Sequence, residues 1–301
     1  MSILSQAHFH NEEAAYNFIE ARIWPNGAVC PHCGGVGRIG KMGGKSTRIG
    51  VYKCYDCRKP FTVKVGTIFE SSHIPLRLWL QAIFLISSSK KGISSNQLHR
   101  TLGITLKSAW FMSHRIREAM KGNDKGFLGK GGNVVEADET YIGRKPGTKV
   151  RRGHGHKNAV FSLVERKGSV RSFHVPNVTA DTLKKKLLAH VSKKAKLMTD
   201  DAKQYIKLGK AFASHESVNH SAEEYVRGNV HTNTIEGFFS IFKRGMKGVY
   251  QHCGHNHLNR YLAEFDFRYN NRMANGTNDT ERAEKLLLGV KGRRLTYNPA
   301  P

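Results

Sequence analysis

Acidic residues are scarce in this chain. Its 301 residues include 23 Asp and Glu against 49 Lys and Arg, which leaves a net charge of +26. A positive field of this size indicates a polyanionic partner, and nucleic acid is the partner that it favours.

Long apolar runs are also missing. The longest apolar stretch, from Leu78 to Ile86, is far shorter than the roughly 20 residues that span a bilayer, so we expect no membrane partner. The N-terminal residues, Asn11, Glu12 and Glu13 among them, lack the basic start and apolar centre of a secretory signal. The expected compartment is therefore the cytosol.

Cysteine is rare but clustered. Four of the 5 cysteines form two CxxC pairs separated by 20 residues, a spacing from which tetrahedral Zn²⁺ sites are built, and these are Cys30, Cys33, Cys54 and Cys57. The surrounding segment is too small for a hydrophobic core, and structural zinc contributes on the order of 10 kcal/mol or more to folding. Four reduced cysteines or a redox dithiol are the alternatives. Cys253 stands alone and is read as an ordinary partly buried thiol.

The rhythm of the chain changes several times. Helical spacing near the N-terminus gives way to short strand-like pieces rich in Gly, then to three helix signals, and after a Gly-rich connector to strand, strand, strand, helix and strand. This order predicts a mixed α/β sheet with flanking helices, preceded by two small modules. The expected organisation is an N-terminal helix at 1–28, a zinc ribbon at 29–66, a helix-turn-helix region at 75–120, a linker at 121–132, an α/β domain at 133–275 and a C-terminal tail at 276–301.

Two segments carry candidate DNA contacts. Residues 93–118 resemble a helix-turn-helix whose second helix would present Lys107 and Arg115 to DNA, although a helical hairpin of this shape can also serve packing alone. The segment 143–157 is rich in Gly and basic residues and holds no acid, so it suits a phosphate backbone, with a solvated hairpin as the alternative. The basic candidates there are Arg144, Lys145, Arg151 and Arg152.

Three acids lie in an unusual arrangement for so basic a chain. Asp138 lies in a strand, Asp200 ends a later strand, and Glu236 lies in a helix that carries Lys243 two turns later. Carboxylates gathered by adjacent parallel strands and a facing helix repel one another unless cations lie between them. Oxygen ligands select Mg²⁺ or Mn²⁺, and two such ions activate a hydroxyl towards a phosphodiester. Asp200 standing alone could instead be a helix N-cap.

The chain resembles insertion-sequence transposases of the DDE class that begin with a zinc ribbon. The resemblance runs from about Cys30 to Arg272 and is carried by CPHCG, YKCYDCRKPFTV, VEADETYIGRK, LMTDD, VNHSAEEYVRGNVHTNTIEGFFSIFKRGMKGVY and RYLAEFDFRYNNR. It implies an RNase H-like catalytic domain with Asp138, Asp200 and Glu236 as the metal-binding triad. The 35 residues between Asp200 and Glu236 match the DD(35)E pattern of related enzymes.

The third ligand and the basic residues after it follow from the same resemblance. Some members of the group carry Asn as the third residue, and Asn233 lies one turn before Glu236. Because a carboxylate binds a hard dication better than an amide does, we expect Glu236 as the ligand and Asn233 as a neighbour that orients metal or DNA. Lys243 and Arg244 are expected to hold phosphates.

The implied function is DNA transposition. The protein would bind the terminal inverted repeats of its element as double-stranded DNA, and cleave and join strands with two Mg²⁺ or Mn²⁺ ions, beside a structural zinc ion. A homodimer or larger synaptic complex, cytoplasmic and associated with the nucleoid of a prokaryote, is expected. The alternatives are a zinc-ribbon and helix-turn-helix regulator without catalysis, and an RNase H-like nuclease that cuts without joining.

Overall fold

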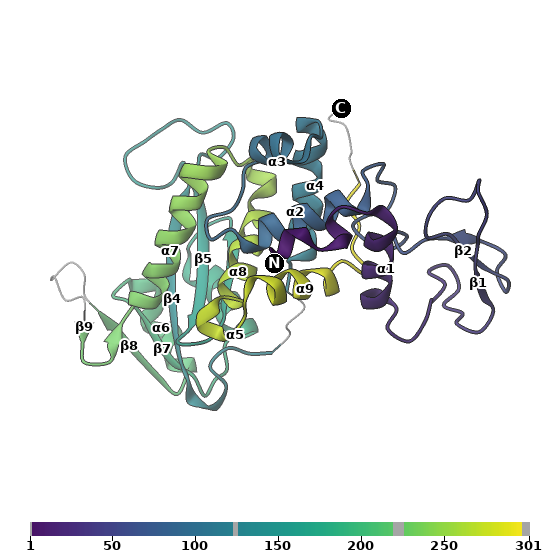
Figure 1. The fold of residues 1–301 in the computed structure, drawn as a ribbon. Helices are drawn as coiled ribbons and strands as arrows, with labels where there is room; N and C mark the ends of the chain where they lie inside the picture. Colours follow the sequence, from purple (N-terminus) through teal and green to yellow (C-terminus); the bar gives the residue numbers. More distant parts are fainter. Residues whose placement is uncertain (1, 123–125, 219–225, 297–301) are drawn as a thin grey trace. The chain divides into compact units, whose positions relative to one another are not determined.

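The chain divides into two units in the computed structural model, which describes residues 2–122, 126–218 and 226–296 (Figure 1). The first unit combines the chain up to Lys121 with the chain from Thr277 onward, and the second unit is Gly122–Gly276. Residues 123–125 of the expected linker and 297–301 of the expected tail lie outside the described residues.

A small antiparallel sheet forms the ribbon of the first unit. Its strands, in spatial order, are β1 (Ile39–Lys41), β2 (Tyr52–Cys54) and β3 (Pro60–Phe61). The chain enters through two 3₁₀ turns, η1 (Ile3–Ser5) and η2 (Ala7–Phe9), and the expected N-terminal helix, α1 (Glu12–Ile23). Glu20 of α1 accepts a hydrogen bond of 2.8 Å from the Tyr52 hydroxyl, which ties this helix to the ribbon.

Four helices complete the first unit. They are α2 (Leu76–Ser88), α3 (Ser95–Leu102), α4 (Leu106–Ala119) and α9 (Asp279–Leu288). The first three confirm the helices expected at 75–120. The fourth lies where we expected a tail: Asn278 and Glu281 form a reciprocal capping box at its start, and the helix packs on α2. No helix in the described ranges has the length and apolar character needed to cross a bilayer.

Helices α3 and α4 meet at a left-handed turn. Gly103 takes φ 65° between them, and Thr105 caps the second helix. The start of α4 is exposed, but its second half is buried except at the half-buried Glu118, with Arg115 6% and Arg117 1% exposed. Our expectation that Arg115 faces outward was therefore wrong, because neighbouring segments of the same unit cover this half of the helix.

A five-stranded mixed sheet forms the centre of the second unit. β4 pairs antiparallel with β5 and parallel with β7, so both pairing modes occur in one sheet. In spatial order the strands are β6 (Val170–Val175), β5 (Asn158–Glu165), β4 (Val134–Ile142), β7 (Lys196–Asp200) and β8 (Ser214–Val218). The predicted fold class, an RNase H-like mixed sheet with flanking helices, is confirmed.

Helices cover both faces of this sheet. Because successive strand residues point to opposite faces, Val135 and Ala137 of β4 pack towards one helical layer, whereas Ile142 packs towards the other. The first layer holds α5 (Ala180–His190) and α6 (Lys203–Leu208), and the second holds α7 (Asn233–Gly245) and α8 (Leu258–Asn270). The shorter elements are a hairpin, β9 (Val226–Arg227) and β10 (Val230–His231), a π-helical turn, η6 (Met246–Tyr250), and 3₁₀ turns at η3 (Lys130–Gly132), η4 (Gly209–Ala211), η7 (His255–His257) and η8 (Met273–Asn275).

Helix α8 covers the edge strand β6 through polar side chains. Asp266 accepts hydrogen bonds of 2.7 Å from both the amide and the hydroxyl of Ser172, and Asn270 binds the amide and carbonyl of Val170. These contacts occupy backbone groups that an open sheet edge would present to another chain. Burial raises the pKa of Asp266 to about 7, although the two Ser172 hydrogen bonds lower it.

Candidate functional site

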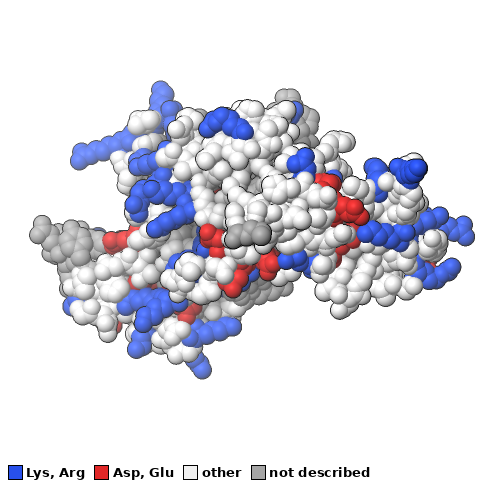
Figure 2. Space-filling model, viewed as in Figure 1, with Lys and Arg blue, Asp and Glu red and all other residues white. Residues whose placement is uncertain are grey.

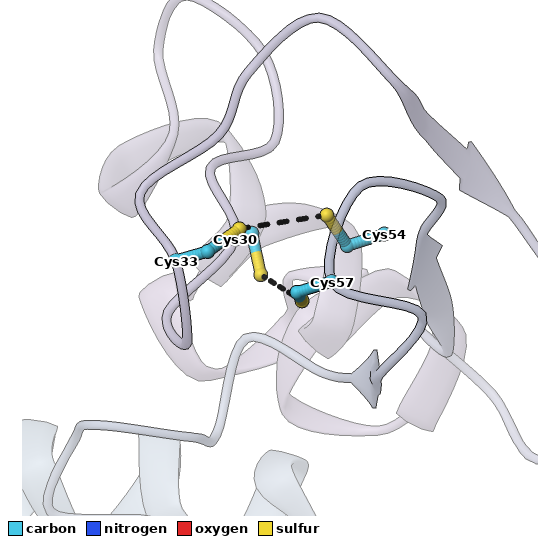
Figure 3. Close-up of side chains that lie close together, drawn as sticks. All are labelled: Cys30, Cys33, Cys54 and Cys57. Atoms are coloured by element: carbon cyan, nitrogen blue, oxygen red, sulfur yellow. Dashed lines mark hydrogen bonds between the residues drawn. The ribbon is translucent and has the colours of Figure 1, made fainter.

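The four cysteines of the ribbon meet at one point (Figure 3). Their sulfur atoms all lie within 4.8 Å of one another, with 3.6 Å between the Sγ atoms of Cys30 and Cys57 and 3.7 Å between those of Cys33 and Cys54. The side chains come from two separate loops and point towards one another. Four sulfur ligands at this spacing match a tetrahedral zinc site.

The two loops that carry the cysteines repeat one geometry. The Cys30 amide donates to the Gly35 carbonyl at 3.0 Å, and the Cys54 amide donates to the Lys59 carbonyl at 3.1 Å. In both loops the residue after the second cysteine has a positive φ, 77° at Gly34 and 62° at Arg58. Each loop thus turns its two sulfurs to the same side, as a CxxC knuckle requires.

The thiols influence one another strongly. Burial raises the pKa of Cys30, but hydrogen bonds from the Cys33 and His32 amides and from neighbouring thiols bring it down to about 7. The pKa of Cys33 is lowered by the Gly35 amide, yet its contacts with the other thiols and its burial raise it to about 12. One thiolate is thus favoured at the expense of its neighbours, a conflict that a divalent cation relieves. The donor set fits structural zinc, as predicted.

The predicted acids lie on neighbouring elements of the second unit. The parallel pairing of β4 with β7 ends at Glu136 opposite Met198, and Asp138 and Asp200 follow two positions later in each strand. Neighbouring strands lie about 4.8 Å apart, and side chains at paired positions share a face. Helix α7, which carries Glu236, packs on β4, and Figure 1 shows it running alongside β4 and β5.

The charges of neighbouring acids act on Asp138. Burial raises the pKa of Asp138 to about 8, and the negative charges of Glu139, Asp200 and Glu236 add to the rise, whereas the Glu139 amide lowers it. Glu236 lies at the exposed start of α7, where its carboxylate accepts 2.8 Å from the Thr232 hydroxyl. The charges of Glu139, Asp200 and Glu236 thus all act on Asp138.

The spacing of the acids differs from that of the cysteines. Within the described ranges, the cysteines are the group of three or more potential ligands whose atoms all lie within 4.8 Å, so the three carboxylates are spread more widely. Ligands shared by two ions about 3.5–4 Å apart span a wider region than ligands of one ion. An all-oxygen donor set whose charges disfavour one another fits hard dications such as Mg²⁺.

The start of α6 shows that Asp200 is not the N-cap residue of that helix. Ala202 is the N-cap of that helix, and Asp200 Oδ1 accepts from the Ala202 amide at 3.2 Å while ending β7. Asp200 therefore lies two residues before the cap position, at the end of the strand.

Two further acids of β4 lie near these residues but were not predicted from the sequence as site residues. Glu139 points to the face opposite Asp138, where it accepts a hydrogen bond from the buried Tyr205 hydroxyl, and burial raises its pKa to about 7. Glu136 shares the face of Asp138 and is wholly buried against Arg166. The signal that could have found Glu136 is a charged residue within an otherwise apolar strand start.

The predicted DNA-binding residues differ in exposure. Helix α7 carries Glu236 and, further along its outer side, the exposed Arg244 and half-buried Lys243, while Asn233 is exposed in its first turn. In the loop 143–157, Arg144, Arg151 and Arg152 are exposed and Lys145 is half-buried; Lys107 is exposed at the start of α4. Figure 2 shows Lys and Arg side chains spread over the visible face, with few acids among them.

The segments that hold these two groups of residues each match a known protein family. Residues 130–270 match the ISXO2-like transposase domain, and residues 10–60 match the transposase zinc-ribbon domain. A protein of Halobacterium salinarum, named as an uncharacterized protein in transposable element ISH50, is 29% identical over 280 residues, which cover 86% of this chain and 91% of that protein.

Proposed function

The chain carries the two domains of a zinc-ribbon-bearing insertion-sequence transposase, and on that premise we propose that it binds the terminal inverted repeats of its element and catalyses DNA cleavage and strand transfer. The observation that supports the proposal is the placement of Asp138 and Asp200 just beyond the paired ends of β4 and β7, with Glu236 in the first turn of a helix that packs on β4, all within the matched transposase domain. In a chain with net charge +26, a group of three carboxylates is suited to hold cations that also contact an anionic substrate.

The proposed reaction has two balanced steps. In the first, a water oxygen attacks the phosphorus beside the element end, the bond to the 3′ oxygen breaks, and that oxygen leaves as a hydroxyl. In the second, this 3′ hydroxyl attacks a phosphodiester of the target strand, so that one phosphorus–oxygen bond forms as another breaks. Two bound Mg²⁺ ions would lower the pKa of the nucleophile and stabilise charge on the leaving oxygen.

The three carboxylates would hold those ions from three sides. Asp138 and Asp200 approach from adjacent strand ends, and Glu236 approaches from the first turn of α7. Asn233, in that same turn, would orient metal or DNA. We assign Glu236 rather than Asn233 as the third ligand because a carboxylate binds a hard dication better than an amide does.

Basic residues near the acids would hold the phosphate backbone. Lys243 and Arg244 follow Glu236 by about two turns of α7. Where the loop 143–157 leaves and rejoins the sheet, a cavity of about 280 Å³ is lined by Lys157 and Lys247, and no acid is among the described residues that line it. Together with Arg144, Lys145, Arg151 and Arg152, these groups would form a cationic track for DNA.

The first unit would supply end recognition. The zinc ribbon presents a rigid metal-held module, and the exposed start of α4 presents Lys107. Because both ends of an element must be processed together, we propose a homodimer or larger synaptic complex, which in a prokaryote would act in the cytoplasm at the nucleoid.

Two other functions predict different results. A DNA-binding regulator without catalysis would make no use of the three acids, whose mutual repulsion would then only destabilise the fold. An RNase H-like nuclease would use them to cut but would never yield joined strands.

The test is strand transfer on oligonucleotides that carry the ends flanking the reading frame, with Mg²⁺. The wild-type protein should give joined products of higher mass, and Asp138→Asn should lose cleavage and joining while retaining DNA binding. Asp181→Asn, which changes an exposed acid paired with Lys185 on α5, is the matched control and should remain active. Full activity in Asp138→Asn would refute the triad, and cleavage without joining would favour the nuclease.

A further inference from the structure

A wholly buried carboxylate lies directly beside the proposed catalytic acids. Glu136 is 0% exposed, and its oxygens accept hydrogen bonds from the Arg166 Nε at 2.6 Å, the Thr234 hydroxyl at 2.9 Å and the Ile235 amide at 2.9 Å. The partners come from the turn after β5 and from the first turn of α7. Glu136 therefore joins three segments that are distant in sequence.

Glu136 does for α7 what an N-cap side chain normally does. The first amides of a helix lack acceptors within the helix, and Thr232, the N-cap residue of α7, makes no capping bond with its own side chain. Instead its hydroxyl donates to Glu236, and Glu136 of the neighbouring strand accepts from the Ile235 amide. A negative charge at this end of the helix also suits the helix dipole.

Arg166 holds the approach to α7. Its two terminal nitrogens donate to the carbonyls of Asn229, at 2.8 Å, and His231, at 2.9 Å, while its own amide donates to the Val134 carbonyl of β4 at 3.0 Å. The guanidinium also compensates the charge that Glu136 buries. Arg166 thus binds both the segment that leads into α7 and the strand β4, which carries Glu136.

We propose that Glu136 and Arg166 are positioning residues that set the separation of Asp138 and Glu236. Glu136 lies two residues before Asp138 on the same face of β4, and it binds the amide of Ile235, the residue immediately before Glu236. The contact is therefore a direct hydrogen-bonded link between the two elements that carry these acids. This inference rests on the proposed function, because it concerns the same metal-binding acids.

The test removes one hydrogen bond without emptying the core. Thr234→Val keeps the shape of the side chain but loses the hydroxyl that donates to Glu136, whereas Thr234→Ser keeps the hydroxyl. Glu136→Gln is the second variant. Thr182→Val is the matched control, because it removes a threonine hydroxyl that bonds Asn177 at 2.7 Å on the other helical layer.

Two measurements on the full chain separate capping from positioning. Amide hydrogen exchange over the first turn of α7 reports the cap without any metal. Titration with Mn²⁺ alone, followed by calorimetry, reports the metal-binding acids. We expect Thr234→Val and Glu136→Gln to exchange faster over residues 233–236 and to bind Mn²⁺ roughly tenfold more weakly, as loss of a group that orients a ligand does. Thr234→Ser and Thr182→Val should match the wild type.

Each outcome decides the matter. Unchanged exchange in both Thr234→Val and Glu136→Gln would overturn the cap, and faster exchange with unchanged Mn²⁺ affinity would overturn the positioning role. If the wild-type protein bound no Mn²⁺, the proposed metal site itself would fall and the positioning role with it, while the exchange data would still report the cap. Weaker Mn²⁺ binding that Thr234→Ser restores would support the inference, since a merely structural defect would not follow the hydroxyl.

Discussion

Arg115 is a structural residue, and we expect its replacement by Met to destabilise the first unit rather than to act on DNA directly. The guanidinium is buried in the second half of α4, where it donates to the carbonyls of Ile68 at 2.8 Å, Glu70 at 2.7 Å and Leu295 at 3.1 Å. It thereby joins α4 to the segment that leads to α2 and to the C-terminal segment that follows α9.

The expected loss follows from those three contacts. A hydrogen bond from a charged donor contributes about 1.5–3 kcal/mol, and a buried carbonyl left without its donor costs about 1–3 kcal/mol. The three bonds share one side chain and are not additive, so we expect Arg115→Met to lower the free energy of unfolding by about 3–5 kcal/mol. Met fills most of the space, which keeps the cavity contribution small.

The assay uses the distribution of tryptophan. Trp24, Trp79 and Trp110 all lie in the first unit, so urea unfolding followed by Trp fluorescence reports that unit. Lys107→Ala, at the exposed start of the same helix, is the control; it should change stability by less than about 0.5 kcal/mol and should weaken DNA binding. An Arg115→Met protein that unfolds at the wild-type urea midpoint but has lost DNA affinity would refute this reasoning.

Three further predictions concern the zinc site, a buried acid and the basic loop. Chelation of zinc should shift the emission of Trp24, which packs edge-on against two rings of the ribbon, to longer wavelength, and added Zn²⁺ should reverse it; an unchanged spectrum would contradict a structural metal. Since the folded pKa of Asp266 is about 7 against 3.8 ordinarily, the folded state binds the extra proton between these values and stability falls as pH rises through this window, by up to about 4 kcal/mol. Asp266→Asn should flatten that dependence in urea midpoints followed by far-UV circular dichroism, and an equal slope in both proteins would count against it. Replacing Arg151 and Arg152 with Ala should reduce the slope of log affinity against log salt by about 2, and an unaltered slope would argue against phosphate contact.

The features that sequence predicted well are those whose geometry is local. A CxxC pair fixes two ligands within one turn, so the spacing of four cysteines was enough to place them together. Strands β4, β5 and β6 and helices α7 and α8 are long enough for their periodicity to show, and β7 follows α5 in the predicted order of strand, helix and strand.

The features that it missed depend on distant partners. Nothing in the periodicity of α4 distinguishes Arg115 from the exposed Lys107, because what covers the helix comes from residues near 70 and 295. Helix α9 has its own capping box, yet its place beside α2 is a long-range contact. The strands β9 and β10 are two residues long each, too short for any pattern to register.

The three acids of β4 show how environment assigns different roles to similar residues. Glu136 has a protein cation, Arg166, at 2.6 Å, so its charge is satisfied within the fold and it serves to hold α7. Glu139, on the opposite face, is held by the Tyr205 hydroxyl. Asp138 accepts a hydrogen bond from the Glu139 amide, which lowers its pKa. The neighbouring charges that act on Asp138 are those of Glu139, Asp200 and Glu236, and they raise its pKa. A carboxylate that the protein buries among like charges gains most from a cation supplied from outside, and by this criterion Asp138 is the residue of the strand best suited to bind metal.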